Sequence, residues 1–111
     1  MSRKATAVDR TLAALADPDR RHVVELLRRR PHRAGELARR TRVSLPAMSR
    51  HLRQLRACGL VAETHPEFDA RVRIYTLEPK PMMALKRWLE ETETLWSVQL
   101  GAFKQHVEEN P

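Results

Sequence analysis

Arginines and short polar side chains gather in one segment near the middle of this chain. The guanidinium groups of Arg50 and Arg53 can pair in a forked geometry with phosphate oxygens or with the edge of a guanine base. Ser44, Ser49 and His51 can donate hydrogen bonds to either partner. Residue types of this kind, at this density, are suited to contacting a nucleic-acid duplex.

The positive charge is concentrated around this segment. The 111 residues include 21 Lys and Arg against 14 Asp and Glu, a net charge of +7, and 17 of the 21 cations are arginine. Residues 26–60 contain ten arginines and one acid, Glu36, which is a net charge of +9. Residues 88–111 contain five glutamates and one lysine, a net charge of −4. The middle of the chain therefore favours a polyanionic partner, and the tail must serve another purpose.

The composition excludes several other classes of protein. The single cysteine, Cys58, rules out an intramolecular disulfide and a four-thiolate zinc site. No apolar run reaches the about 18–20 residues of a membrane span, and the amino-terminal residues lack the apolar stretch of a secretory signal. We therefore expect a cytoplasmic protein without a membrane partner. We also expect no enzymatic activity, because the nearest nucleophile and base, Ser49 and His51, are two residues apart on a helix and do not face each other.

Turn signals divide the first part of the chain into short helices. Apolar residues at helical spacing predict one helix over about residues 5–16, and Asp17 followed by Pro18 is typical of the start of the next. That second helix should stop near Pro31, and a third is expected over residues 33–40. The residues expected to be buried on the second and third helices are Val23, Val24, Leu26, Leu27, Leu37 and Ala38.

A fourth helix positions the polar segment. Ser44 is its expected N-cap, Pro46 is tolerated in the first turn, and Gly59 marks its end. Its expected buried stripe consists of Met48, Leu52 and Leu55. A short side chain such as Ala47 on the opposite face would let the backbone approach a major groove, which is about 12 Å wide. Two helices joined by a tight turn, the second with this composition, predict a helix-turn-helix.

After Gly59 the apolar pattern changes from helical to alternating. Residues 60–64 and 72–77 predict two strands joined by a loop, which makes a β-hairpin. The expected fold is therefore mainly α with a small β-hairpin, an α+β arrangement. We expect one domain over residues 1–111, with a DNA-binding core over 5–78 and a carboxy-terminal dimerisation helix over 79–111.

The loop of the hairpin contains both signs of charge. Glu67 and Asp69 lie near its tip, where they would be repelled by phosphate. Arg71 and Arg73 are expected on the ascending strand, where their spacing by two places them on the same face, and they are therefore the preferred DNA contacts of the hairpin. Phe68 is expected to pack against the protein rather than to insert into a groove.

The last predicted helix, from about Pro81 to Glu108, carries a long apolar stripe. Its 3–4 spacing persists over about six turns, and it contains three of the five aromatic residues. One small domain cannot cover so long a stripe, so we expect a two-fold dimer seam to which the first helix contributes, the alternative being an intrachain core helix. The expected interface residues are Val8, Leu12, Leu15, Leu85, Trp88, Leu89, Leu95, Trp96 and Phe103.

Three segments resemble the ArsR-type winged helix-turn-helix repressors. They are residues 15–27 (LADPDRRHVVELL), residues 35–38 (GELA) and residues 44–61, which contain the specific pattern SxPAxSRHLxxLxxxGLV. The resemblance extends from about residue 12 to residue 77. It implies a homodimeric repressor that places the helix from Ser44 in the major groove of a near-palindromic operator, with the hairpin as a wing on the flanking minor groove or backbone.

The residues expected to contact double-stranded DNA lie on the helix-turn-helix and the hairpin. They are Arg33, Arg40, Arg42, Ser44, Leu45, Ala47, Ser49, Arg50, His51, Arg53, Arg71 and Arg73. An arginine-rich amphipathic helix is often only a solvated surface. The N-cap spacing, the hairpin that follows and the single acid in the basic stretch favour DNA binding here.

Many members of this family sense metals through a thiol box on the first helix of the motif or through Asp/His pairs on the carboxy-terminal helices. Residues 34–38 contain no thiol or imidazole, and His106 with Glu109 would supply only half of a carboxylate–histidine site. We expect no metal or other cofactor, as in the metal-independent subset, and we expect His32 on the surface. The alternatives are a metal- or redox-responsive member, the latter through Cys58, a non-specific architectural binder, or an interaction module without DNA binding.

Overall fold

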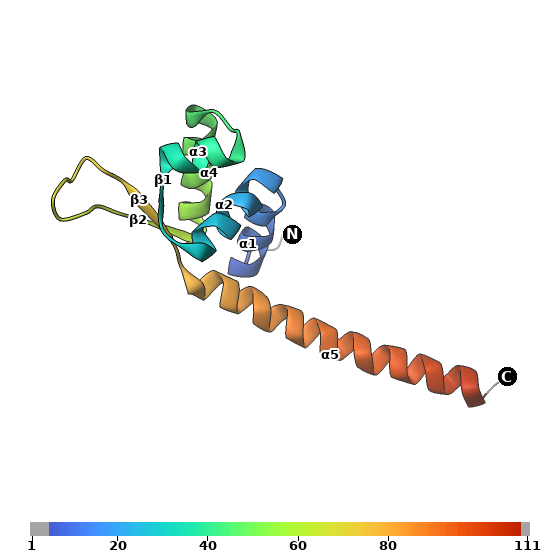
Figure 1. Cartoon of the computed structure of the whole chain (residues 1–111). Helices are drawn as coiled ribbons and strands as arrows, with labels where there is room; N and C mark the ends of the chain where they lie inside the picture. Colours follow the sequence, from blue (N-terminus) through green and yellow to red (C-terminus); the bar gives the residue numbers. More distant parts are fainter. Residues whose placement is uncertain (1–4, 110–111) are drawn as a thin grey trace.

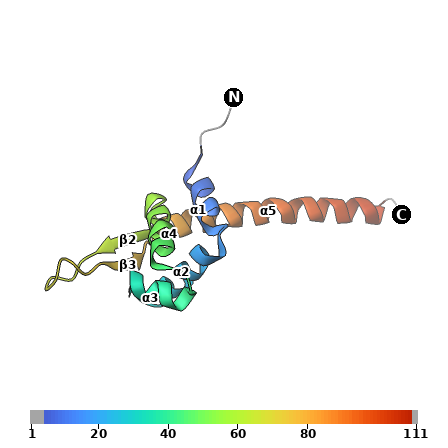
Figure 2. The same ribbon diagram turned by 90° about the horizontal axis from the view of Figure 1, so that it is seen from above.

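The computed structural model describes residues 5–109. In chain order its elements are α1 (Ala7–Leu15), α2 (Pro18–Arg29), β1 (His32–Arg33), α3 (Ala34–Thr41), α4 (Leu45–Ala57), β2 (Val61–Thr64), β3 (Ile74–Leu77) and α5 (Pro79–Glu109). Helices α1–α4 and the three strands form a headpiece, from which α5 projects as one long helix (Figure 1). The hairpin of β2 and β3 projects from the opposite side of the headpiece (Figure 2). The predicted mainly helical winged helix-turn-helix is confirmed.

The starts of α2 and α4 follow local capping chemistry. Asp17 Oδ1 accepts the backbone N–H of Asp19 at 2.8 Å, and Ser44 Oγ accepts that of Ala47 at 3.3 Å. Each side chain satisfies an amide that has no partner inside the first turn of its helix. Gly59, directly beyond the last turn of α4, has a φ of 79°, a value that suits glycine. These predicted boundaries are confirmed.

The headpiece core contains the apolar faces expected from the sequence. Leu37, Met48 and Leu55 are each 0% exposed, and together they join α3 to α4. The predicted core residues that the structure buries are Val23, Val24, Leu26, Leu27, Leu37, Ala38, Met48, Leu52 and Leu55. Because this stripe of α4 points inward, the rotation of the helix is set, and its polar face is turned to solvent.

A third strand was not expected. The sheet is antiparallel with the order β1-β3-β2, and β1 pairs His32 with Tyr75 and Arg33 with Ile74. Arg33 is therefore extended and lies directly before α3, although the sequence suggested that it begins that helix. His32 is only 4% exposed, so its assignment to the surface was wrong. A two-residue strand has no periodicity, and only its pairing with β3 defines it.

The wing strands are shorter than predicted. Leu60 lies outside β2 because its N–H donates to Leu55 O at 3.0 Å and closes the end of α4. The ladder ends where Thr64 pairs with Ile74, and Pro66, which lacks an N–H, follows soon afterwards. Arg71 and Arg73 were expected in the second strand, but both precede β3 and lie in the loop of residues 65–73.

Helix α5 contacts α1 at its beginning and then leaves the headpiece. Leu85 is 6% exposed, so this expected seam residue is already buried within its own chain. All residues from 93 to 109 are exposed. The large apolar side chains that α5 leaves exposed are Met83, Trp88, Leu89, Leu95, Trp96, Val98, Leu100, Phe103 and Val107. Within residues 5–109, no helix is both long and apolar enough to cross a membrane.

Candidate nucleic-acid interface

The connection between α3 and α4 is a tight turn. Arg42 follows α3 in the left-handed conformation, with a φ of 58°, and its N–H donates to Arg39 O at 3.3 Å. The N–H of Val43 donates to Ala38 O at 3.1 Å, after which Ser44 caps α4. Only three residues therefore separate the two helices, which form a helix-turn-helix.

The outer face of α4 carries unpaired cations. Arg50 and Arg53 are exposed, and their side chains form no hydrogen bond or ion pair within the described part of the chain. Leu45, at the first position of the helix, is 52% exposed. Both guanidinium groups are therefore free to bind an external phosphate or base edge.

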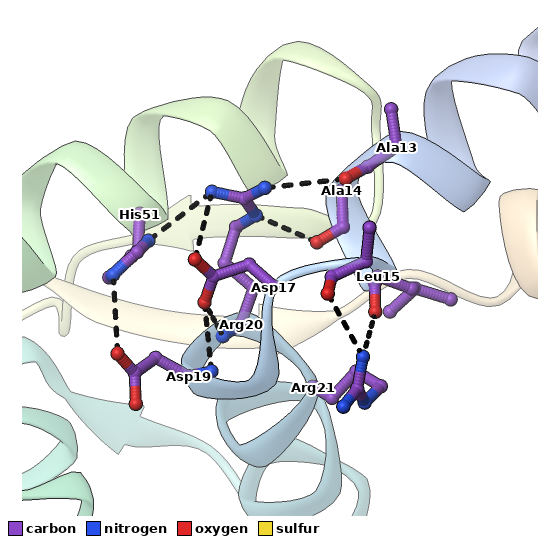
Figure 3. A network of polar contacts seen from close by, with 9 residues as sticks. Ala13, Ala14, Leu15, Asp17, Asp19, Arg20, Arg21 and His51 are labelled. Carbon is purple, nitrogen blue, oxygen red and sulfur yellow. Dashed lines mark hydrogen bonds and ion pairs between the residues drawn. The ribbon is translucent and has the colours of Figure 1, made fainter.

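His51 is directed toward α2 instead of solvent (Figure 3). Its Nδ1 lies 3.4 Å from Arg20 Nη1, and its side chain is 16% exposed. Arg20 also donates from Nε to Ala14 O at 2.7 Å and from Nη2 to Ala13 O at 3.3 Å. The guanidinium of Arg20 therefore joins the carboxyl end of α1 to the middle of α4. His51 is better situated to hold α4 in place than to reach a base.

The same network contains a set of side chains with metal-binding atoms. Asp17, Asp19 and His51 offer one ligand atom each within 4.8 Å of one another. Arg20 Nη1 lies 4.0 Å from Asp17 Oδ2, so an arginine already supplies the positive charge. Burial opposes ionisation of Asp17, but hydrogen bonds from the backbone N–H groups of Arg20 and Asp19 outweigh it and lower the pKa of the carboxyl. The arrangement is a charge-compensated structural network, and we assign no metal to it.

Glu36, the single acid of the basic stretch, is also used within the chain. It accepts a short hydrogen bond from Arg30, and its Oε1 lies 3.4 Å from Arg40 Nε and 3.4 Å from His32 Nε2. The hydrogen bond from Arg30 is the main cause that lowers the pKa of the Glu36 carboxyl. Buried His32 is further held by Nδ1, 2.8 Å from Arg30 O. Glu36 therefore holds the side chains of Arg30, His32 and Arg40 close together beside α3.

The loop of the wing presents its side chains to solvent. Phe68 is 83% exposed, so the expectation that it packs against the protein was wrong; the loop tip extends beyond the strands and offers nothing to cover the ring. The Arg71 side chain is 92% exposed, and its Nε lies 3.3 Å from Asp69 Oδ1. Arg73 Nε lies 3.5 Å from Glu63 Oε1 at the base of the loop.

The predicted contact residues come from β1, α3, the turn, α4 and the wing loop. The exposed ones are Arg33, Arg40, Arg42, Ser44, Leu45, Ser49, Arg50, Arg53, Arg71 and Arg73, whereas Ala47 and His51 are half-buried. Sequence reasoning did not single out Arg56 and Glu63, whose side chains meet at 2.8 Å. They lie seven residues apart on a helix and a strand, and no local pattern connects them.

The three-stranded sheet, the tight α3–α4 turn and the projecting hairpin define a winged helix-turn-helix DNA-binding protein. The family model for the bacterial regulatory protein arsR family matches residues 17–63. Over 100 residues the chain is 39% identical to the HTH-type transcriptional regulator Rv2034 of Mycobacterium tuberculosis, covering 90% of this chain and 88% of that protein. The chain belongs to the ArsR family of bacterial regulatory proteins.

Solved structures agree with this assignment. An ArsR-like transcriptional regulator from Rhodococcus sp. RHA1 is 30% identical with a TM-score of 0.80, covering 95% of this chain and 94% of that one. A crystal structure of another ArsR family transcriptional regulator is 33% identical with a TM-score of 0.74, covering 83% of this chain and 98% of that one. The protein is thus a DNA-binding transcriptional regulator and not an enzyme, and its partner is double-stranded DNA.

Proposed function

We propose that this regulator is a cytoplasmic homodimeric repressor that occludes a promoter by binding a near-palindromic operator. The observation that carries the proposal is the outer face of α4, where Arg50 and Arg53 are exposed and unpaired while Met48 and Leu52 fix the opposite face in the core. A helix held in this way can enter a major groove without repacking of the headpiece.

The proposed contacts divide into two kinds. Arg50 and Arg53, together with the neighbouring Ser49, are assigned to base edges because they lie on the face of α4 that is turned to solvent. Arg40 and Arg42, at the end of α3 and in the turn, are assigned to phosphates. The remaining proposed contacts are Arg33, Ser44, Leu45 and Ala47 near the helix-turn-helix, and Arg71 and Arg73 on the wing.

The proposed dimer uses α1 and α5. A groove of about 430 Å³ between them is lined by Val8, Leu12 and Trp88, together with Thr6 and Asp9. Leu12 and Trp88 are each 42% exposed, and Trp88 belongs to the row of exposed apolar side chains that α5 carries toward its carboxyl end. A contiguous apolar surface of this extent is typical of an interface, and the two-fold pairing of identical helices would cover it. In this proposal residues 1–111 form one domain with its core in 5–78, although residues 1–4 and 110–111 lie outside the described part.

Genomic binding followed by footprinting tests the operator. We expect two protected half-sites related by a palindrome, with centres about one helical turn or a multiple apart, that is about 34–36 Å per turn. Sedimentation of the protein–DNA complex should give two chains per operator. Equal competition by a scrambled duplex, with a steep dependence on salt, would instead support the architectural binder.

In vitro transcription from the footprinted promoter tests repression. We expect added protein to reduce initiation in proportion to operator occupancy, and an increase in initiation would contradict the repressor assignment. The same assay with a chelator, with added zinc ions, and with reduced or oxidised protein tests the metal- and redox-responsive alternatives. Unchanged repression under all these conditions is the expected result.

A further inference from the structure

One carboxylate joins the end of α4 to both strands of the wing. Glu63 lies in β2, and its side chain is 11% exposed. Its Oε2 accepts from Arg56 Nη1 at 2.8 Å and from Tyr75 Oη at 3.2 Å. Its Oε1 lies 3.5 Å from Arg73 Nε and 3.9 Å from His65 Nε2. Side chains from α4, from β3 and from the wing loop therefore meet at a single acid.

The strand register and the hydrogen bond from Tyr75 give the Glu63 carboxylate a fixed position. Glu63 and Tyr75 stand directly opposite each other in the β2–β3 register. The Tyr75 ring is part of the headpiece core and is 6% exposed, so its hydroxyl is a rigid donor. Arg56 belongs to the last turn of α4, where it is 52% exposed. Tyr75 of the core therefore fixes the position of the Glu63 carboxylate. Glu63 in turn fixes the positions of the guanidinium groups of Arg56 and Arg73.

We infer that Glu63 is a positioning residue for DNA recognition by the wing. It determines where the guanidinium groups of Arg56 and Arg73 lie relative to α4, so that both meet the DNA backbone only when α4 is seated in its groove. This inference rests on the proposed use of α4 and the wing and adds the residue that couples them.

The charge of Glu63 has a second effect. The carboxylate offsets part of the positive charge of Arg56 and Arg73, which weakens their attraction to any phosphate that approaches in another geometry. Without that charge the two arginines would bind phosphate regardless of sequence, because counterion release rewards every neutralised phosphate. Glu63 therefore favours the specific complex and disfavours the non-specific one.

The test compares Glu63→Gln with Glu67→Gln in the full chain. Glu67 lies in the same wing and is exposed, and its side chain has no hydrogen bond or ion pair within the described residues. Both variants change the net charge equally, but only Glu63→Gln weakens the contacts of the carboxylate with Arg56, Tyr75 and Arg73. Affinity for the footprinted operator and for a scrambled duplex is measured across a salt series, and hydroxyl-radical footprints report protection of the DNA flanking the half-sites.

For Glu63→Gln we expect the ratio of specific to non-specific affinity to fall about tenfold, with the salt slope on scrambled DNA steeper by about 1. The flank protection should lose its fixed positions and spread along the DNA, because the two arginines are no longer held in place, while protection of the half-site centres remains. Glu67→Gln should keep the flank protection. Circular dichroism of each variant checks the fold, and Arg73→Gln, whose side chain is 66% exposed, should lose flank protection without any change in the core.

Two outcomes separate this inference from the function on which it rests. If the wild-type chain shows no preference for any duplex, the proposed function fails. If the wild type is specific but Glu63→Gln keeps the flank protection and affinity ratio of Glu67→Gln, the role of Glu63 is overturned and the proposed function stands. Loss of both specific and non-specific binding in a folded Glu63→Gln variant would also overturn it.

Discussion

Gly59 lies directly against Pro81, so the end of α4 meets the beginning of α5. A Cβ added to Gly59 would be 3.6 Å from Pro81 Cγ, an ordinary van der Waals distance, whereas its φ of 79° is unfavourable for any other L-residue. The backbone conformation therefore constrains this position more than the space around it does.

Gly59→Ala should destabilise the protein by about 1–2 kcal/mol, the cost of a left-handed residue with a side chain. Urea unfolding at a fixed protein concentration measures the change. Gly35→Ala is the matched control, because Gly35 lies in α3 and an added Cβ would meet only the end of the Arg39 side chain at 3.7 Å. Equal destabilisation by the two substitutions would contradict the role given to the φ angle.

Arg42→Gly should have the opposite effect on stability. Arg42 has a φ of 58° in the turn of the helix-turn-helix, and glycine removes the steric cost of that conformation. We expect the free energy of unfolding to rise by about 1 kcal/mol while operator affinity falls, because the proposed phosphate contact is lost. Thermal unfolding and fluorescence anisotropy provide the two measurements. A variant that is both less stable and unchanged in affinity would refute both assignments.

The hydroxyl of Tyr75 makes stability depend on alkaline pH. Burial, followed by the negative charge of Glu63, raises the pKa of Tyr75 above its ordinary value. The neutral phenol is therefore favoured in the folded state, and this stability is complete below about pH 10 and is lost as the pH rises through the folded pKa.

Tyr75→Phe should cost about 1 kcal/mol at pH 7 through the lost hydrogen bond, and it should flatten the decline in stability above pH 10. Urea midpoints at pH 7 and in the alkaline range measure both effects at one protein concentration. The wild type and the variant should converge as the pH rises. If the free energy of unfolding of Tyr75→Phe declined above pH 10 as steeply as that of the wild type, the decline would be due to other groups.

Arg50 and Arg40 should differ in what they contribute to binding. Arg50→Ala should weaken operator binding by about 1–3 kcal/mol and relax the preference at one base pair. Arg40→Ala should weaken binding to all duplexes alike and reduce the salt slope by about 1. Arg30 still pairs with Glu36 in that variant, so the ion pair next to α3 is kept. Binding selections on randomised half-sites distinguish the two patterns. Identical sequence preferences of the two variants would contradict the assignment of Arg50 to a base edge and Arg40 to a phosphate.

Trp96→Glu should separate the proposed dimer. Trp96 is 58% exposed on the apolar stripe of α5, and a charge placed there would be buried at a two-fold seam. Ser97→Glu adds the same charge about 100° around the helix and serves as the control. Sedimentation equilibrium should show monomers only for Trp96→Glu, with operator affinity reduced in parallel. Dimers of Trp96→Glu with full affinity would locate the seam elsewhere.

The helix-turn-helix was predictable because its signals are local. The Ser44 cap lies within three residues of the amide that it accepts, and Met48, Leu52 and Leu55 repeat at helical spacing. Their burial also fixes which side of α4 faces outward, so the exposure of Arg50 and Arg53 followed from the same pattern.

The features that were missed depend on contacts between distant residues. His32 is buried because β1 pairs with β3, more than 40 residues away, and the two-residue strand has no pattern of its own. The junction at Glu63 joins residues from α4, β2 and the wing, none of which is distinctive alone. Phe68 was expected to pack against the protein, but the loop of residues 65–73 extends beyond the strands and leaves its side chain 83% exposed.

If the proposed dimer forms through α5, the exposed second half of this helix makes the regulator's response depend on its own concentration. Residues 93–109 are exposed throughout a single chain, and most of the stability of a helix in a protein comes from packing of its apolar face, which this segment lacks in one chain. In the proposed dimer, pairing stabilises this segment and brings two recognition helices together, so assembly precedes tight binding. Operator occupancy then rises more steeply than in proportion to protein concentration. A modest change in synthesis or degradation of the chain would be enough to switch the promoter.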